Sequence, residues 1–205
     1  GNNLDFIVYD YLAEITMSIM ARARAKDPSK GYAIDFVSSV MKLNLRQIAD
    51  QKVKILSNAG GVNPQACAEA IRALIKELNL DLKVAVVLGD DLLEDKDKFL
   101  DSGVQEMYSD EKFPEVDKVA SINAYLGAFP IAQALNDGAD IVITGRSVDS
   151  AVTLAACIHT YGWKEDEYDK LASGSLAGHI IECGTQSTGG NFTDWELVSK
   201  DLHMI

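Results

Sequence analysis

Short apolar runs alternate with longer amphipathic segments along the chain. Five runs are rich in β-branched and aliphatic residues in nearly continuous order, which is typical of strands covered on both faces of a parallel sheet. These candidate strands are residues 4–10, 53–58, 82–88, 119–123 and 139–144. Between them the apolar positions return at helical spacing, so the pattern predicts strands and helices in alternation.

The clearest helical pattern covers residues 64–79, where Cys67, Ile71 and Ile75 fall on one face. Asn63 is a favourable N-cap, and Pro64 stands at the first helical position, where proline is tolerated. Further helices are predicted at residues 11–25, 33–50, 130–137 and 147–161 and within 166–183.

Strands that alternate with helices indicate βαβ units, and we therefore predict an α/β fold with an open, mainly parallel sheet in three layers. A closed barrel needs about eight such units, more than the five strands found here. We expect one domain over residues 1–205, with an acidic, irregular excursion at about 90–118 that is either a lid or a solvated loop. Both ends of the chain suggest the N-terminal part of a longer protein.

The net charge of the chain disfavours some classes of binding partner. The chain of 205 residues has a formal net charge of −12 and no basic stripe, which argues against nucleic acid and anionic membrane surfaces. No apolar stretch reaches the roughly 18–20 residues of a membrane span, and no signal peptide pattern opens the chain. Three widely spaced cysteines argue against a disulfide framework. We expect a cytoplasmic protein.

Polar residues gather where the predicted strands end. Ligands of open α/β sheets bind beyond the carboxyl ends of the strands, and these ends meet at one edge. The residues there, with one acid from the first helix, are Asp10, Glu14, Asn58, Gly60, Gly61, Asn63, Asp90, Asp91, Asn123, Tyr125, Gly145, Arg146 and Ser147. Their convergence predicts a site for a small anionic ligand, whereas the alternative is that they only form turns and caps.

The segment that follows the last predicted strand suggests an anion-binding corner. Gly145 permits a close approach of backbone to ligand, and Arg146 offers a planar fork suited to a carboxylate or phosphate. Ser147 or Asp149 is expected to cap the next helix, whose first amides attract anions. Alternatively, Arg146 pairs with Asp149 or Asp10 and braces the sheet edge.

The loop NAGGVNP, residues 58–64, places Gly60 and Gly61 before a capped helix. This resembles a phosphate cradle in principle, but it is neither GxGxxG nor GxxxxGK[ST], so no nucleotide fingerprint applies. The loop is expected either to bind a small carboxylate or pyrophosphate or to bind nothing.

Metal and acid–base chemistry have two candidate locations. His179, Glu182 and Cys183 fall on one turn of a predicted helix, but no second pair completes a zinc set, so we predict no structural metal site and consider His179 or Glu182 as an acid or base. The second location is the strand ends, where acidic oxygens are ligands that magnesium prefers. These acids are Asp10, Glu14, Asp90 and Asp91.

Long phrases of the chain resemble the acyclic terpene utilisation (AtuA) family. They are DYLAEITMSIMARARAKDPSKGYAIDFV, NAGGVNPQACAEAIRAL, INAYLGAFPIAQALNDGADIVITGRSVDSAVTLAACIHTYGW and LAGHIIECGTQSTGGNFTDW. Residues 92–118 lie outside the resemblance. The phrases contain most of the strand-end residues, together with Gly189, Gly190 and Asn191.

The resemblance implies a role in the degradation of acyclic terpenes such as citronellol and geraniol, whose acids are handled as CoA thioesters beside a biotin-dependent geranyl-CoA carboxylase. It also implies a longer protein with a glycine-containing strand before DYLAE. We therefore expect a lyase- or hydrolase-type enzyme acting on a small carboxylate or acyl-CoA, with Asp149, Glu182 and His179 as acid–base groups. The alternative is a non-catalytic binding or assembly module for a partner carboxylase. In either case, a homo-oligomer or an assembly with the remainder of the protein is expected.

Overall fold

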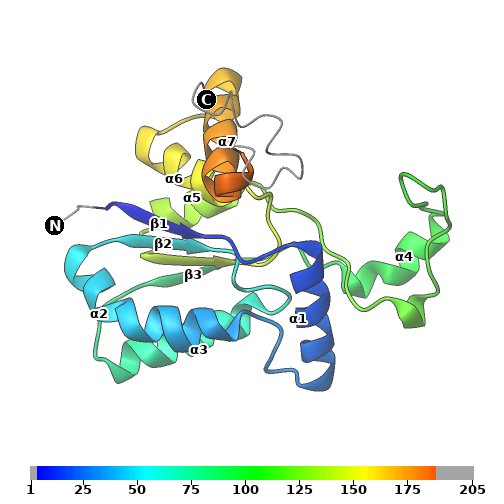
Figure 1. The fold of residues 1–205 in the computed structure, drawn as a ribbon, viewed down its shortest axis with the longest axis horizontal. Helices are drawn as coiled ribbons and strands as arrows, with labels where there is room; N and C mark the ends of the chain where they lie inside the picture. The colour runs from blue at the N-terminus through cyan, green and yellow to red at the C-terminus, as the bar shows by residue number, and fades with distance from the viewer. Residues whose placement is uncertain (1–3, 188–205) are drawn as a thin grey trace, which may run out of the picture.

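The computed structural model describes residues 4–187, and within them four parallel strands form one sheet in the order β1-β2-β4-β3. The strands are β1 (Phe6–Tyr9), β2 (Lys54–Ser57), β3 (Val84–Val87) and β4 (Ile141–Thr144). Helices cover both faces of the sheet, so the predicted three-layer α/β fold is confirmed (Figure 1). Four of the predicted strands are also confirmed, each shorter than its apolar run.

One face of the sheet packs against η1 (Phe36–Met41), α2 (Lys42–Gln51) and α3 (Pro64–Glu77). Successive residues of a strand point to opposite faces, and Ile55 of β2 with Ile141 and Ile143 of β4 points to this side. The helices contribute the following buried side chains: Phe36, Met41, Leu45, Ile48, Cys67, Ile71 and Ile75.

The opposite face packs against α5 (Ala128–Asn136) and α6 (Ala151–Tyr161). The intervening strand residues, Leu56 and Val142, point to this side and meet Ile131 and Val152. All four side chains are at most 1% exposed, so both faces of the central strands are sealed from water. α7 (Tyr168–Cys183) lies outside this layer and packs on α6.

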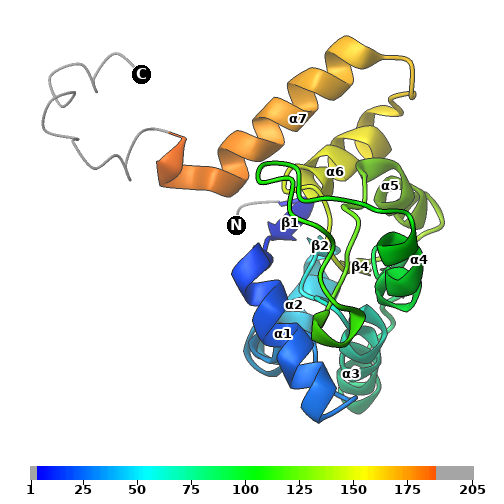
Figure 2. The ribbon, with the colours of Figure 1, turned by 90° about the vertical axis from the view of Figure 1, so that its right-hand side faces the viewer.

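Two segments lie beyond the carboxyl ends of the strands (Figures 1 and 2). α1 (Glu14–Lys26) stands across this end of the sheet, and the acidic excursion projects away from the body. The excursion contains the short helices η2 (Leu93–Asp95), α4 (Lys96–Asp101) and η3 (Val116–Lys118). A last turn, η4 (Gly184–Gln186), follows α7. No helix within 4–187 is long and apolar enough to cross a membrane.

Two predicted elements are wrong. Residues 119–123 do not form a strand: Asn123 makes only an isolated antiparallel bridge with Asp91, because this segment crosses the strand ends and pairs with the loop after β3. The helix predicted from Ser147 begins at Ala151 instead. Leu126 pairs with the backbone on both sides of Ser147 and keeps that segment extended.

The two buried residues of α7 are glycines one turn apart, Gly174 and Gly178. A Cβ on Gly178 would lie 2.9 Å from the carbonyl oxygen of Ser150, at the start of α6. The missing side chain therefore lets the two helices approach closely and fixes the position of the last turn of α7.

The close contact of Gly178 with α6 predicts that an alanine here lowers the stability of the protein, the opposite of its usual effect in a helix. Glycine to alanine in a helix normally stabilises it by about 1 kcal/mol. We expect Gly178→Ala to destabilise the protein by about 1–3 kcal/mol instead, because the new methyl group overpacks the α6–α7 contact. Urea unfolding monitored by circular dichroism measures this. The control is Ala177→Gly at a neighbouring exposed position, which should lose only about 1 kcal/mol. A gain in stability for Gly178→Ala would contradict the packing argument.

Candidate functional site

The loops after β1 and β2 are joined by a buried amide. Asn58 is fully buried, and its Oδ1 accepts a hydrogen bond from the Tyr11 backbone N–H at 2.7 Å. Its Nδ2 donates to the Asp10 carboxylate. Asn58 therefore holds the chain as it leaves β1, and it directs one carboxylate toward the carboxyl edge of the sheet.

The loops after β3 and β4 are joined by a buried carboxylate. Asp90 is 2% exposed, and its Oδ2 accepts hydrogen bonds from the Arg146 backbone N–H at 2.8 Å and from Asn123 Nδ2 at 2.9 Å. Burial raises the pKa of Asp90. Gly145 lies against this carboxylate, and any Cβ there would fall far inside van der Waals contact with it.

Arg146 is buried, and its guanidinium joins three segments of the edge. Nη1 donates to the carbonyl oxygens of Leu12 and Ser147, both at 3.1 Å, and to Asp149 Oδ1 at 2.9 Å. Nη2 lies 3.3 Å from Glu14 Oε1. The pairing with Asp149 is the bracing contact that the sequence left open, and Glu14 rather than Asp10 is the second acidic partner.

Tyr125 covers the guanidinium from the solvent side. Its ring centroid lies 4.2 Å from Arg146 Cζ, a cation–π geometry, and its hydroxyl donates to Glu14 Oε1 at 2.5 Å. The hydrogen bond from Tyr125, with a further contribution from Arg146, lowers the pKa of Glu14. Glu14 is therefore held as a carboxylate by two donors that meet at a single oxygen atom.

Further acidic groups lie beside Asp149. Burial raises the pKa of Glu182, the thiol of Cys183 lowers it by donating a hydrogen bond, and the carboxylates of Asp10 and Asp149 raise it. The last turn of α7 thus brings Glu182 to the ends of β1 and β4. Glu14 and Asp149 pair with the guanidinium, and Glu182 and Asp10 add further negative charge beside Asp149.

The same helical turn carries His179 and Cys183. The thiol donates to Glu182 Oε2 at 3.2 Å and lies 3.7 Å from His179 Nε2. The hydrogen bond to Glu182, together with burial and the nearby acids, raises the pKa of Cys183. The predicted acid–base residues Asp149, Glu182 and His179 are therefore neighbours, although they are separated by up to 33 positions in the chain.

The part of the NAGGVNP loop that follows Asn58 makes structural contacts. Gly60 touches the end of β4, where a Cβ would strike the backbone, and Gly61 has a φ of +55°. Asn63 caps α3 at 3.4 Å, and its Nδ2 donates to the carbonyl oxygens of Pro28 and Lys30. Next to this loop is a pocket of about 310 Å³, bounded by Arg24, Asn63, Gly89 and Asp91.

Two capping expectations are corrected. The N-cap of α6 is Ser150, without a side-chain hydrogen bond, so neither Ser147 nor Asp149 caps this helix. Asp149 pairs with Arg146, whereas the buried Ser147 Oγ has no hydrogen-bond partner among residues 4–187. Both residues precede the N-cap of α6, and the Asp149 carboxylate is held by Arg146 instead.

The acids proposed for magnesium each have a separate partner. Asp10 bonds to Asn58, Glu14 to Tyr125, Asp90 to Asn123, and Asp91 to Arg24 at 2.6 Å. Within the described part of the chain, one group of three potential metal ligands lies within 4.8 Å of one another, and it consists of His179, Glu182 and Cys183.

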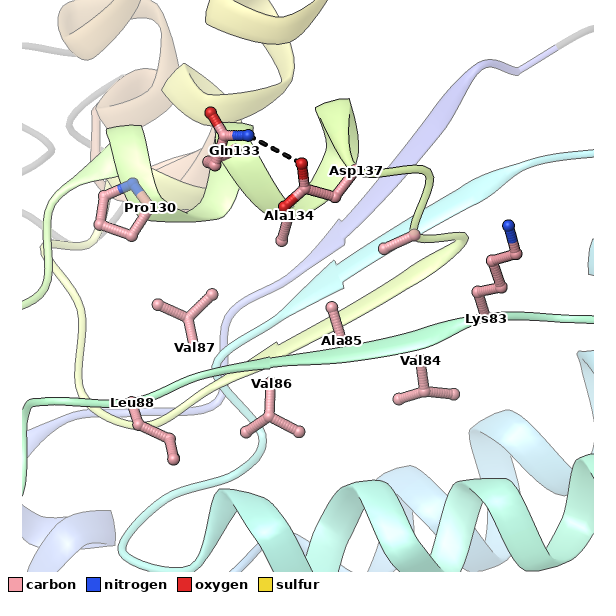
Figure 3. Close-up of a pocket in the computed structure, with 11 residues that line it drawn as sticks. Lys83, Val84, Ala85, Val86, Val87, Leu88, Pro130, Gln133, Ala134 and Asp137 are labelled. Carbon is pink, nitrogen blue, oxygen red and sulfur yellow. Dashed lines mark hydrogen bonds between the residues drawn. The ribbon is translucent and has the colours of Figure 1, made fainter.

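The sequence analysis placed Asp90 at the end of a strand and Cys183 on one helical turn with His179. It missed that Asp90 is buried between two loops and that the Cys183 thiol donates to Glu182. A pocket of about 430 Å³ was also missed. It lies between β3 and α5, where Ala85 and Val87 face Ala134 and where Gln133 donates to Asp137 at 2.8 Å (Figure 3).

A family model supplies the remaining observation. The model described as acyclic terpene utilisation family protein AtuA matches residues 1–205. The chain belongs to this family. Searches of curated proteins and of solved structures found no match. The phrases that resemble the AtuA family include site residues such as Asn58, Tyr125 and Arg146, whereas their Gly189, Gly190 and Asn191 lie outside the described residues.

Gly145 gives a test of the site's packing. We expect Gly145→Ala to destabilise the protein by about 1–3 kcal/mol or more, because the methyl group displaces Asp90 from its two donors. Gly127→Ala is the matched control, since a Cβ at Gly127 meets nothing within 4 Å, and it should cost less than about 1 kcal/mol. Thermal and urea unfolding measure both. Equal effects of the two variants would count against the Asp90 contact.

Asp90 also gives a pH prediction. Because folded Asp90 keeps its proton to higher pH than the unfolded chain, whose carboxyl titrates near 3.8, the folded state binds more protons above that pH. The contribution of Asp90 to the free energy of unfolding therefore falls as pH rises from 3.8 through the raised folded pKa. As the pH rises through this window, the free energy of unfolding of Asp90→Asn should therefore increase relative to that of the wild type. Urea unfolding at several pH values measures the difference. A constant difference would contradict the raised pKa.

Proposed function

We propose that this AtuA-family protein is an enzyme that acts on a small carboxylate or acyl-CoA of acyclic terpene catabolism at the carboxyl edge of its sheet. Membership of the family supports the terpene context. The position of the site supports the proposal as well, because open α/β sheets bind ligands at this edge.

One observation carries the proposal. Arg146 Nη2 and the Tyr125 hydroxyl converge on the same oxygen of Glu14. A guanidinium and a phenol that meet at one carboxylate oxygen also form a suitable receptor for the carboxylate, or for the carbonyl oxygen, of a substrate. Glu14 occupies the position that such a group would take.

Glu14 is placed so that a substrate can displace it. Its side chain is 78% exposed and its contact with Arg146 is 3.3 Å long, whereas the Arg146 side chain is 5% exposed. Because the Glu14 carboxylate remains in contact with water, we expect its pair with Arg146 to contribute little, about 1 kcal/mol, so that a substrate carboxylate can replace it. Arg146 would remain fixed by Leu12, Ser147 and Asp149 during the exchange.

Acid–base groups lie next to this receptor. The raised pKa of Glu182 suits it to carry a proton at higher pH than an ordinary carboxyl group. Asp149 would orient Arg146 and act as a base, and His179 lies within 3.9 Å of Glu182. Proton transfer, hydration or hydrolysis beside a carbonyl is the chemistry that this set of groups supports.

A second candidate function is a non-catalytic assembly module for a partner acyl-CoA carboxylase. The outer face of α7 favours it, because Leu176, Ile180 and Ile181 are 48–67% exposed. A mainly apolar pocket of about 490 Å³ beside the edge strand β1 is lined in part by Ile181 and Tyr161. Apolar surface of this kind is typical of subunit contacts, including those of a homo-oligomer.

The enzyme proposal predicts opposite effects of two substitutions on ligand binding. Tyr125→Phe removes the hydroxyl and keeps the ring over Arg146, so affinity should fall about tenfold to 100-fold, the value of a hydrogen bond to a charged group. Glu14→Ala empties the receptor, so affinity should rise about twofold to tenfold. The probes are geranyl-CoA, citronellyl-CoA, short branched acyl-CoAs and the corresponding free acids, and the measurements are thermal shift and calorimetry.

Tyr161→Phe is the control, since this exposed tyrosine stacks on Trp163 away from Arg146. Changes of the same sign in Tyr125→Phe and Glu14→Ala would overturn the receptor. The absence of binding with every probe, together with self-association in size-exclusion chromatography, would favour the assembly module.

A further inference from the structure

The last turn of α7 presents three different metal-ligating side chains to one point. His179 and Cys183 are four residues apart and Glu182 is three residues from His179, so all three project from the same side of the helix. With Nδ1 as the ligand atom of His179, the sulfur lies 3.2 Å from Glu182 Oε2 and 4.0 Å from Nδ1, and Nδ1 lies 3.9 Å from the same Glu182 oxygen.

These separations are a few tenths of an ångström from those of one face of a coordination tetrahedron. Zn²⁺ binds nitrogen and oxygen at about 2.0–2.2 Å and sulfur at about 2.3 Å, which puts neighbouring ligand atoms about 3.3–3.6 Å apart at tetrahedral angles. The three side chains therefore need only small rotations to bind one ion. Because a single helical turn carries all of them, little chain entropy is lost on binding.

The electrostatics of the site also favour a cation. The carboxylates of Asp10 and Asp149 lie close enough to Glu182 and Cys183 to act on both electrostatically. Arg146 already serves two carboxylates, Glu14 and Asp149. The carbonyl end of the α7 dipole adds further negative potential at this turn.

We propose that His179, Glu182 and Cys183 form a binding site for a divalent transition metal ion of the zinc class, with a fourth position open to water or to a substrate oxygen. A thiolate, an imidazole and a carboxylate select such an ion over Mg²⁺, which prefers oxygen ligands alone. Three protein ligands with an open fourth position are typical of catalytic rather than structural zinc sites.

The location gives the ion a role at the sheet edge. A metal at the end of α7 lies beside the carboxylates that follow β1 and β4, and it would supply positive charge where the acids outnumber the single arginine. It would also neutralise the repulsion between Glu182, Asp10 and Asp149. With an ion bound, Glu182 and His179 would be ligands and not proton carriers, which leaves Asp149 as the acid–base group. Metal binding itself does not depend on the proposed acyl-CoA function.

The test measures metal binding and not activity. The metal-free protein is titrated with Zn²⁺ in the calorimeter and with Co²⁺ in the spectrophotometer, where thiolate coordination gives a charge-transfer band in the near ultraviolet. We expect one ion per chain and the charge-transfer band. Cys183→Ser should abolish the band, and Cys183→Ser and His179→Gln should each weaken binding by at least about 100-fold, since even outer-shell partners change metal affinity by about 10–100-fold.

The chain offers matched controls for both substitutions. Cys157→Ser removes a half-buried thiol on α6, and His159→Gln removes an imidazole that contacts Asn136 at 2.7 Å. Both controls should bind metal as the wild type does, and circular dichroism checks that every variant is folded. The absence of stoichiometric binding in the wild type would overturn the proposal. So would undiminished binding in folded Cys183→Ser and His179→Gln.

Discussion

A buried guanidinium holds the carboxyl edge of this sheet together. Arg146 follows β4 directly, and its donors reach the chain after β1, the start of α1 and the turn before α6. A charge removed from water is costly unless its donors are satisfied, so the surrounding carbonyls and carboxylates must keep their positions. The position of Arg146 is in turn fixed through its own backbone N–H, which donates to the buried Asp90.

The same constraint explains several features that are not obviously related. Gly145 lacks a side chain because the Asp90 carboxylate occupies the space beside it. Asn123 crosses the strand ends instead of joining the sheet, because its amide donates to Asp90. Tyr125 then lies over the guanidinium. Loops that are distant in the chain are thus ordered around two buried charged groups, and their polar side chains converge at one edge.

The charge balance at this edge shapes what it is suited to bind. In the proposed receptor, Arg146 and Tyr125 hold a carboxylate, and in this structure it is the carboxylate of Glu14. Asp10, Asp149 and Glu182 make the surroundings acidic, which favours a proton or a metal ion beside the receptor. An anionic ligand and a cation in neighbouring positions would balance each other, and the proposed receptor and the proposed metal site provide for both.

The sequence by itself determined the layers of the fold and the location of the candidate site. Continuous apolar runs identified four strands, amphipathic periods identified their helices, and the shared edge of parallel strands located the polar loops. Which side chains contact one another was decided only by the tertiary structure. Three features depend on distances between segments that lie up to 172 positions apart, such as Asp10 and Glu182. They are the choice of Glu14 as the second acidic partner of Arg146, the burial of Asp90 and the approach of α7 to β1. Local periodicity carries no information on such distances, because they are set by how closely helices and loops pack.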